Sequence, residues 1–108
     1  MNTASTSIDP QRLRAAAGQA VATLKLLANE DRLLLLCQLA EGELSVGDLE
    51  ARLGIRQPTL SQQLGVLRTE GMVLTRRDGK RIFYRVADPQ VLEVLAVLYR
   101  LYCPKDAP

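Results

Sequence analysis

The stretch SVGDLEARLGIRQPTLSQQLGVLRTE, residues 45–70, predicts two helices joined by a short turn. Ser45 opens a capping box in loose form, with Asp48 in the place of glutamate, and predicts a helix over residues 46–53. Pro58, expected at a first helical position, predicts a second helix that ends near residue 70. The turn GIRQ between them has the glycine and the length of a helix-turn-helix.

The residues after this pair of helices change from helical spacing to alternation. Successive side chains are expected on opposite sides of a strand over residues 73–77, and again over residues 80–86, where Ile82, Tyr84 and Val86 share one side. Asp78-Gly79 between them is a preferred sequence for a tight hairpin turn. A hairpin directly after a helix-turn-helix predicts a winged helix-turn-helix, a fold that is mainly α with a two-stranded β-hairpin.

Two helices are predicted before this unit. Asp9-Pro10 combines a carboxylate cap with proline at the first position and predicts a helix over residues 10–27. Asn29 is expected to cap a second helix, which stops at Gly42.

The last predicted helix begins at Asp88-Pro89 and runs to about Tyr102. It is apolar around most of its circumference, and one small domain cannot cover such a helix on all sides. Part of it is therefore expected to meet a second subunit. We expect one domain over residues 9–103, between a flexible N-terminal tail (1–8) and a C-terminal tail (104–108).

Composition narrows the class of protein. The 108 residues are 47% hydrophobic and 24% charged, the balance of a globular domain. No apolar run approaches the roughly 20 residues of a membrane span, and the start lacks a signal peptide, so a cytoplasmic location is expected. The net charge is +2, yet residues 56–85 carry +5. A basic segment in an otherwise mildly acidic chain indicates contact with phosphate, although a solvated charged hairpin gives the same pattern.

The second helix of the pair and the hairpin carry the side chains expected to contact DNA. Hydroxyl and amide groups on a helix in the major groove can donate to and accept from base edges, and arginine or lysine binds guanine or phosphate. Taken singly, each of these polar residues could also be an ordinary surface residue. The predicted DNA-binding residues are Gln57, Thr59, Ser61, Gln62, Gln63, Arg68, Arg77, Lys80 and Arg81.

Four segments of the chain resemble the ArsR/SmtB family of bacterial repressors. They are LANEDRL (27–33), QPTLSQQL (57–64), LRTEG (67–71) and RDGKR (77–81), and the resemblance extends over roughly residues 12 to 103. It implies a homodimer through the first and last helices that binds an inverted-repeat operator. Such a repressor leaves its operator when an inducer binds.

The resemblance also bears on metal sensing. Metal-sensing members carry a Cys-x-Cys near the helix expected over residues 46–53, or aspartate and histidine sets on the last helix. This chain has no histidine, and Asp88 and Glu93 alone are poor ligands for zinc. We therefore expect neither a metal site nor a cofactor.

Cys37 and Cys103 are the remaining candidates for a switch. Cys37 lies on the apolar stripe of its helix, where cysteine behaves as a small hydrophobe, and Cys103 could be an incidental thiol at a helix end. Their positions nevertheless resemble the persulfide-sensing branch of the family. That resemblance implies that reactive sulfur species link the two thiols by a disulfide or polysulfide bridge and so release the repressor from DNA.

Other functions stay open at this point. The same fold could sense peroxide, a thiophilic metalloid or an organotin through the thiols, and Cys103-Pro104 resembles the short motif of haem-responsive regulators. A rival of another class is an architectural or protein-interaction module without operator specificity. An enzyme is not expected, because the chain lacks histidine, a nucleotide-binding glycine loop and a carboxylate pair in a plausible pocket.

Overall fold

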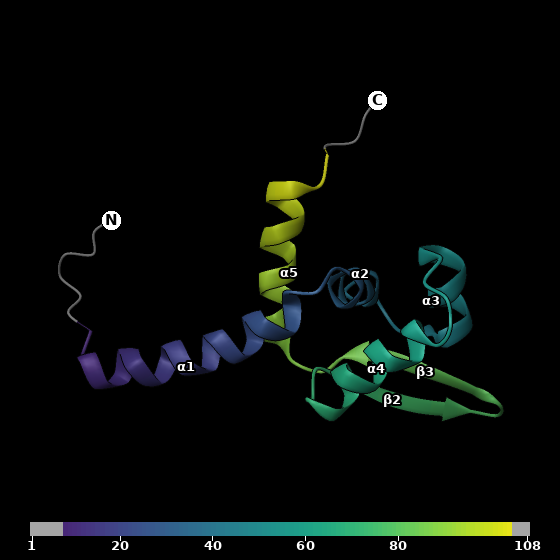
Figure 1. Cartoon of the computed structure of the whole chain (residues 1–108), viewed down its shortest axis with the longest axis horizontal. Coiled ribbons are helices and arrows are strands. Elements are labelled where there is room, and N and C mark those ends of the chain that lie inside the picture. The colour runs from purple at the N-terminus through teal and green to yellow at the C-terminus, as the bar shows by residue number, and fades with distance from the viewer. Residues whose placement is uncertain (1–7, 105–108) are drawn as a thin grey trace.

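The computed structural model describes residues 8–104, so the predicted tails, 1–8 and 104–108, lie almost entirely outside the described residues. Figure 1 shows how the helices and the hairpin are arranged in space. Along the chain the structure has five helices and three strands within the described residues. They are α1 (Pro10–Leu27), α2 (Glu30–Leu39), β1 (Leu44–Ser45), α3 (Val46–Leu53), α4 (Thr59–Thr69), β2 (Val73–Asp78), β3 (Arg81–Val86) and α5 (Pro89–Tyr102).

Capping groups in the sequence set the helix boundaries. The side chain of Asn29 accepts a hydrogen bond from the backbone N–H of Arg32 at the start of α2. The capping box of α3 is complete, because Ser45 and Asp48 each accept from the backbone N–H of the other. Gly54 ends α3 at φ 70°, a left-handed conformation in which a side chain is strained. These predicted caps are confirmed.

Two helix ends differ from their predicted positions. Pro58 precedes the first residue of α4 instead of occupying it, and its carbonyl accepts from Gln62 N–H at 3.0 Å. Helix α2 ends at Leu39 rather than near Gly42, because the chain tightens there into i+3 hydrogen bonds, of which one joins Gly42 N–H to the Leu39 carbonyl. Both differences are shifts of a boundary, not of an element.

The predicted hairpin forms, but its turn lies at Gly79-Lys80 rather than at Asp78-Gly79, because Asp78 ends β2 and pairs with Arg81. A third short strand joins the hairpin. The strand order is β1-β3-β2, all antiparallel, with Thr75 opposite Tyr84 inside the hairpin. β1 pairs Leu44 with Tyr84 and Ser45 with Phe83. Two residues are too short to show alternation, so the sequence pattern did not reveal β1. This strand joins the hairpin of β2 and β3, here called the wing, to the start of α3.

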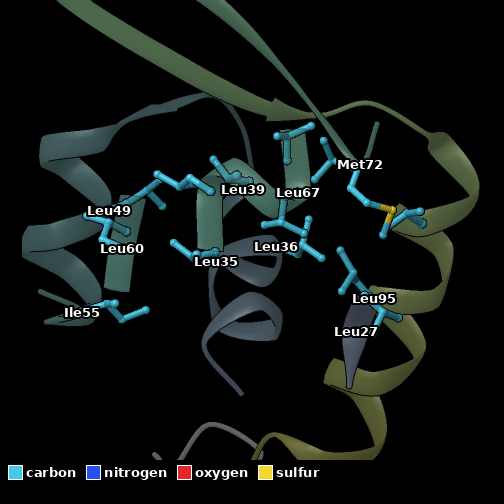
Figure 2. Packing of buried hydrophobic residues seen from close by; sticks show 14 residues of the cluster. Leu27, Leu35, Leu36, Leu39, Leu49, Ile55, Leu60, Leu67, Met72 and Leu95 are labelled. Atoms are coloured by element: carbon cyan, nitrogen blue, oxygen red, sulfur yellow. The ribbon is translucent and has the colours of Figure 1, made fainter. Parts of the chain in front are cut away.

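The core lies between α2, α4 and the inner side of the wing (Figure 2). The leucines of α2 are at its centre, since Leu35 and Leu36 have no exposed surface and Leu39 has 2%. Helix α5 adds Val91 and Leu95 at one end. The other buried apolar residues are Leu27, Leu49, Ile55, Leu60, Leu64, Leu67, Met72, Val73 and Val86.

Helix α1 extends away from the rest of the chain (Figure 1). The radius of gyration is therefore 16.4 Å, whereas a compact chain of this length has about 13 Å. Only Leu27 of α1 is buried. Large apolar side chains stay exposed on α1 (Leu13, Val21, Leu24) and on α5 (Leu92, Val97, Tyr99, Leu101, Tyr102). None of the helices within residues 8–104 is long and apolar enough to cross a membrane.

Replacing Leu35 should test the central role of α2. Leu35→Ala leaves a cavity in a fully buried position and is expected to lower the free energy of unfolding by about 2–5 kcal/mol. Its neighbour Leu34 is 39% exposed, and Leu34→Ala should cost less than about 1 kcal/mol. Urea unfolding at one protein concentration measures both. Equal losses would contradict the assignment of the core.

Candidate nucleic-acid interface and thiol pair

The outer face of α4 is polar because its leucines point inward. Leu60, Leu64 and Leu67 are buried, while Ser61, Gln62 and Arg68 are exposed. Thr59, at the first turn, is half-buried. This predicted set of α4 therefore lies at least partly on the surface, with hydroxyl, amide and guanidinium groups that can bond to base edges and phosphates.

Gln57 closes the N-terminus of α4. Its side-chain oxygen accepts from the backbone N–H of Ser61 at 3.2 Å and also from the Ser61 hydroxyl. Pro58 occupies the capping position and has no side-chain acceptor, so a free N–H of the first turn finds its partner in Gln57 instead. Gln57 and Ser61, both predicted to bind DNA, are thus hydrogen-bonded to each other. The amide NH₂ of Gln57 remains a donor.

Gln63 is the predicted α4 residue that turns inward. It is half-buried, and its Oε1 accepts a hydrogen bond from Nη1 of Arg32 on α2 at 3.0 Å. Sequence reasoning missed Arg32. The only local signal was an arginine at the edge of an apolar run, and its partner on α4 is far away in the sequence.

The wing presents basic side chains at its tip. Arg77 and Lys80 are exposed and make no ion pair or side-chain hydrogen bond within residues 8–104. Arg81 is exposed too, but its Nη2 donates to Ser45 Oγ at 3.0 Å and lies 3.6 Å from Asp48. Arg77 and Lys80 are therefore free to bind phosphate, whereas Arg81 also fastens the wing to α3.

A second arginine holds the wing on its other strand. Arg76 binds the carboxylate of Glu43 with Nε and Nη2, the shortest contact being 2.7 Å. Its guanidinium carbon lies 4.7 Å from the ring centre of Phe83, and that of Arg81 lies 4.9 Å away. Such stacking of cations on an aromatic ring adds to the ion pair. No local pattern in the sequence indicates the Arg76–Glu43 pair, because its two residues are 33 positions apart.

The two cysteines are free thiols in different surroundings. Cys37 of α2 is half-buried against the core, and Cys103, directly after α5, is exposed. Burial is the larger cause that raises the pKa of Cys37, and the charge of Cys103 raises it further. The two thiols lie on α2 and directly after α5, two helices that pack against each other.

No set of three metal-ligating side chains gathers within the described part of the chain. What the fold offers is a polar helix face, a basic hairpin fixed beside it and a pair of thiols. A helix-turn-helix followed by such a wing defines a winged helix-turn-helix DNA-binding regulator.

Comparison with known proteins gives the family. Residues 29–75 match the family described as bacterial regulatory protein, arsR family. Over 83 residues the chain is 57% identical to the biofilm growth-associated repressor of Agrobacterium fabrum. The matched segment covers 77% of this chain and 71% of that protein. The chain belongs to the ArsR family of bacterial transcriptional regulators.

Solved structures agree with this assignment. The crystal structure of the transcriptional repressor BigR from Xylella fastidiosa has a TM-score of 0.83 at 45% identity, over 91% of this chain and all of that one. Reduced HlyU from Vibrio cholerae has a TM-score of 0.82 at 42% identity, over 87% of this chain and 99% of that chain. The fold class and the family resemblance predicted from the sequence are confirmed. The relatives are transcriptional regulators rather than enzymes.

The Glu43–Arg76 pair should give the stability a pH dependence. The hydrogen bond from Arg76 is the main cause that lowers the pKa of Glu43, so the pair stabilises the fold at neutral pH and is lost as pH falls through the lowered pKa. Glu43→Gln should lower the melting temperature at pH 7, and the difference should begin to shrink as pH falls below the ordinary glutamate pKa of about 4.3. Glu41→Gln, at an exposed neighbour, is the control. A difference that is constant from pH 7 to pH 3 would contradict this.

The two thiols should differ in reactivity. Iodoacetamide reacts with thiolates, and burial keeps Cys37 protonated, so Cys103 is expected to be alkylated first at neutral pH. Peptide mapping by mass spectrometry over time measures the order. In Cys103→Ser protein, Cys37 should remain slow, because burial is the larger cause of its raised pKa. Faster alkylation of Cys37 in the folded protein would overturn the assignment.

Proposed function

We propose that the chain is a dithiol-switched repressor. It binds an inverted-repeat operator as a homodimer and leaves DNA when reactive sulfur species link Cys37 to Cys103. The observation that carries the proposal is the placement of one thiol on α2 and another at the end of α5, two helices that pack against each other, in a fold of the ArsR family.

DNA binding is assigned to the α4 face and the wing tip. Helix α4 enters the major groove with Thr59, Ser61 and Gln62, and Arg68 contacts the backbone or a guanine. Arg77 and Lys80 at the wing bind phosphates beside the groove. The +5 charge of residues 56–85 supports this docking, although Glu43 neutralises Arg76 and Asp48 partly neutralises Arg81.

The homodimer is assigned to α1 and α5. Both helices leave large apolar side chains exposed, including Leu24 at 55%, Leu101 at 61% and Tyr102 at 78%. A second copy would cover these faces, which removes apolar surface from water. Two-fold symmetry then sets two α4 helices to read the two halves of an inverted repeat.

The switch follows from sulfur chemistry at the two thiols. A persulfide RSSH gives its terminal sulfur to the Cys103 thiolate: the S–S bond of RSSH breaks, and RSH leaves with the proton. The Cys37 thiol then attacks Sγ of the Cys103 persulfide as it gives up its proton, a disulfide forms, and the outer sulfur leaves with that proton as hydrosulfide. The two cysteines are oxidised by two electrons, and the transferred sulfur is reduced. If Cys37 already carries a sulfane sulfur, the same displacement leaves a trisulfide.

The bridge would act on DNA binding through α5. Linking α2 to the end of α5 restrains a helix of the subunit interface and thereby changes how the two α4 helices are spaced. To release DNA, the bridged form must bind the operator less tightly by about 1–3 kcal/mol, the usual size of an allosteric coupling.

Intact mass and operator binding test the proposal together. Reduced protein is treated with glutathione persulfide, and parallel samples receive glutathione disulfide or hydrogen peroxide. An operator selected from random inverted repeats, and its scrambled version, are used in gel shifts. We expect persulfide to produce an intrachain bridge, seen as loss of the thiol hydrogens with or without added sulfur, and to abolish operator binding. Cys37→Ser and Cys103→Ser proteins should neither form the bridge nor leave the operator.

Each other result points to a different function. Equal bridging with the ordinary disulfide or peroxide would make the protein a general thiol switch rather than a persulfide sensor. Absence of any intrachain product would remove the cysteines from the switch. Equal affinity for operator and scrambled DNA would favour an architectural module.

A further inference from the structure

Arg32 joins three helices with one guanidinium group. It stands in the first turn of α2 and is half-buried. Its Nε donates to the carbonyl of Leu26 at 2.8 Å and its Nη2 to the carbonyl of Lys25 at 3.1 Å, both in the last turn of α1. Its Nη1 donates to Oε1 of Gln63 on α4 at 3.0 Å.

At α1, this arginine acts as a C-terminal cap. The last carbonyls of a helix have no partner within the helix and carry its partial negative charge. A guanidinium ion can satisfy two of them at once because its donors form a rigid planar fork. Lysine keeps the charge, but it lacks the fork and cannot reproduce this bridge.

At α4, the same group fixes the helix that faces DNA. Leu60, Leu64 and Leu67 hold α4 in the core, but apolar packing is weakly directional. A hydrogen bond from a cation is stronger and depends on angle. Gln63 is the one predicted DNA-reading residue whose acceptor oxygen is taken by another helix.

We propose that Arg32 and Gln63 are positioning residues, which set the orientation of α4 relative to α1. This inference rests on the proposed function, in which α1 belongs to the subunit interface and α4 reads the operator. The link transmits the arrangement of the interface to the reading helix within each subunit. Gln63 then contributes to operator binding through Arg32 rather than by contact with a base.

The experiment uses the full chain with three variants and one control. Arg32→Lys removes the fork, Gln63→Met removes the acceptor with little change of size, and the double variant combines them. Arg52→Lys is the matched control, because Arg52 also donates to a glutamine, Gln38, but joins α3 to α2. Fluorescence anisotropy measures the Kd for the selected operator and for scrambled DNA at one salt concentration. Melting temperature and sedimentation check folding and oligomeric state.

Each single variant is expected to bind the operator about tenfold more weakly, as for loss of a charged hydrogen bond, with unchanged affinity for scrambled DNA. The double variant should be no weaker than the weaker single one, since both changes break one link. The control should stay within about twofold of the unmodified protein. Additive losses would overturn the proposal and make Gln63 an independent base contact. Unchanged operator affinity in Gln63→Met would overturn it as well, and this variant decides the matter if Arg32→Lys fails to fold.

Hydrogen exchange separates this inference from the proposed function. If the unmodified protein shows no preference for the operator, the proposed function fails, but the link itself is still measured. Amides of residues 59–69 should exchange faster in Arg32→Lys and Gln63→Met, to the same extent, and not in Arg52→Lys. Unchanged exchange across α4 in both variants would show that the link does not hold the helix.

Discussion

Burial of the α2 leucines is the interaction on which the rest of the structure depends. Leu35, Leu36 and Leu39 contribute almost no surface to solvent, and α2 packs against α1, α3, α4, α5 and β3. A chain this short supports a single core, so one central helix meets all the other helices and the central strand. Removing that burial would loosen the α4 face and the wing together, because neither has a core of its own.

The same central position explains why the polar and reactive groups of interest lie on or beside α2. Arg32 lies in its first turn and Cys37 in its last. Apolar packing holds α2 in place without prescribing precise angles, whereas hydrogen bonds and covalent bridges do prescribe them. A signal that reaches either end of α2 therefore acts on a helix that already contacts the predicted interface helices and α4, the predicted DNA-reading helix.

The elements that were predictable from the sequence are those governed by neighbouring residues. Asn29, Ser45 and Gly54 mark helix ends through contacts within a few positions, and Asp78-Gly79 marks the hairpin. The features that were not predictable from the sequence join distant residues: β1 pairs with β3, Arg32 with Gln63 and Arg76 with Glu43. Composition and spacing carry no information about such pairs. For the predicted DNA-binding face, helical phase indicated the exposed residues of α4 but could not show that Gln57 and Gln63 have protein partners.

The unequal surroundings of the two thiols give the proposed switch an order of events. A donor of sulfur must first meet an accessible thiolate, and Cys103 is exposed at the end of α5. Cys37 is held as a thiol by burial, so it is poorly suited to react with a molecule from solution. It is well placed to attack a sulfur already bound to its neighbour, because that step needs proximity rather than access. The bridge then closes on the helix that carries the core, where a small displacement cannot be absorbed without moving α4 or α5.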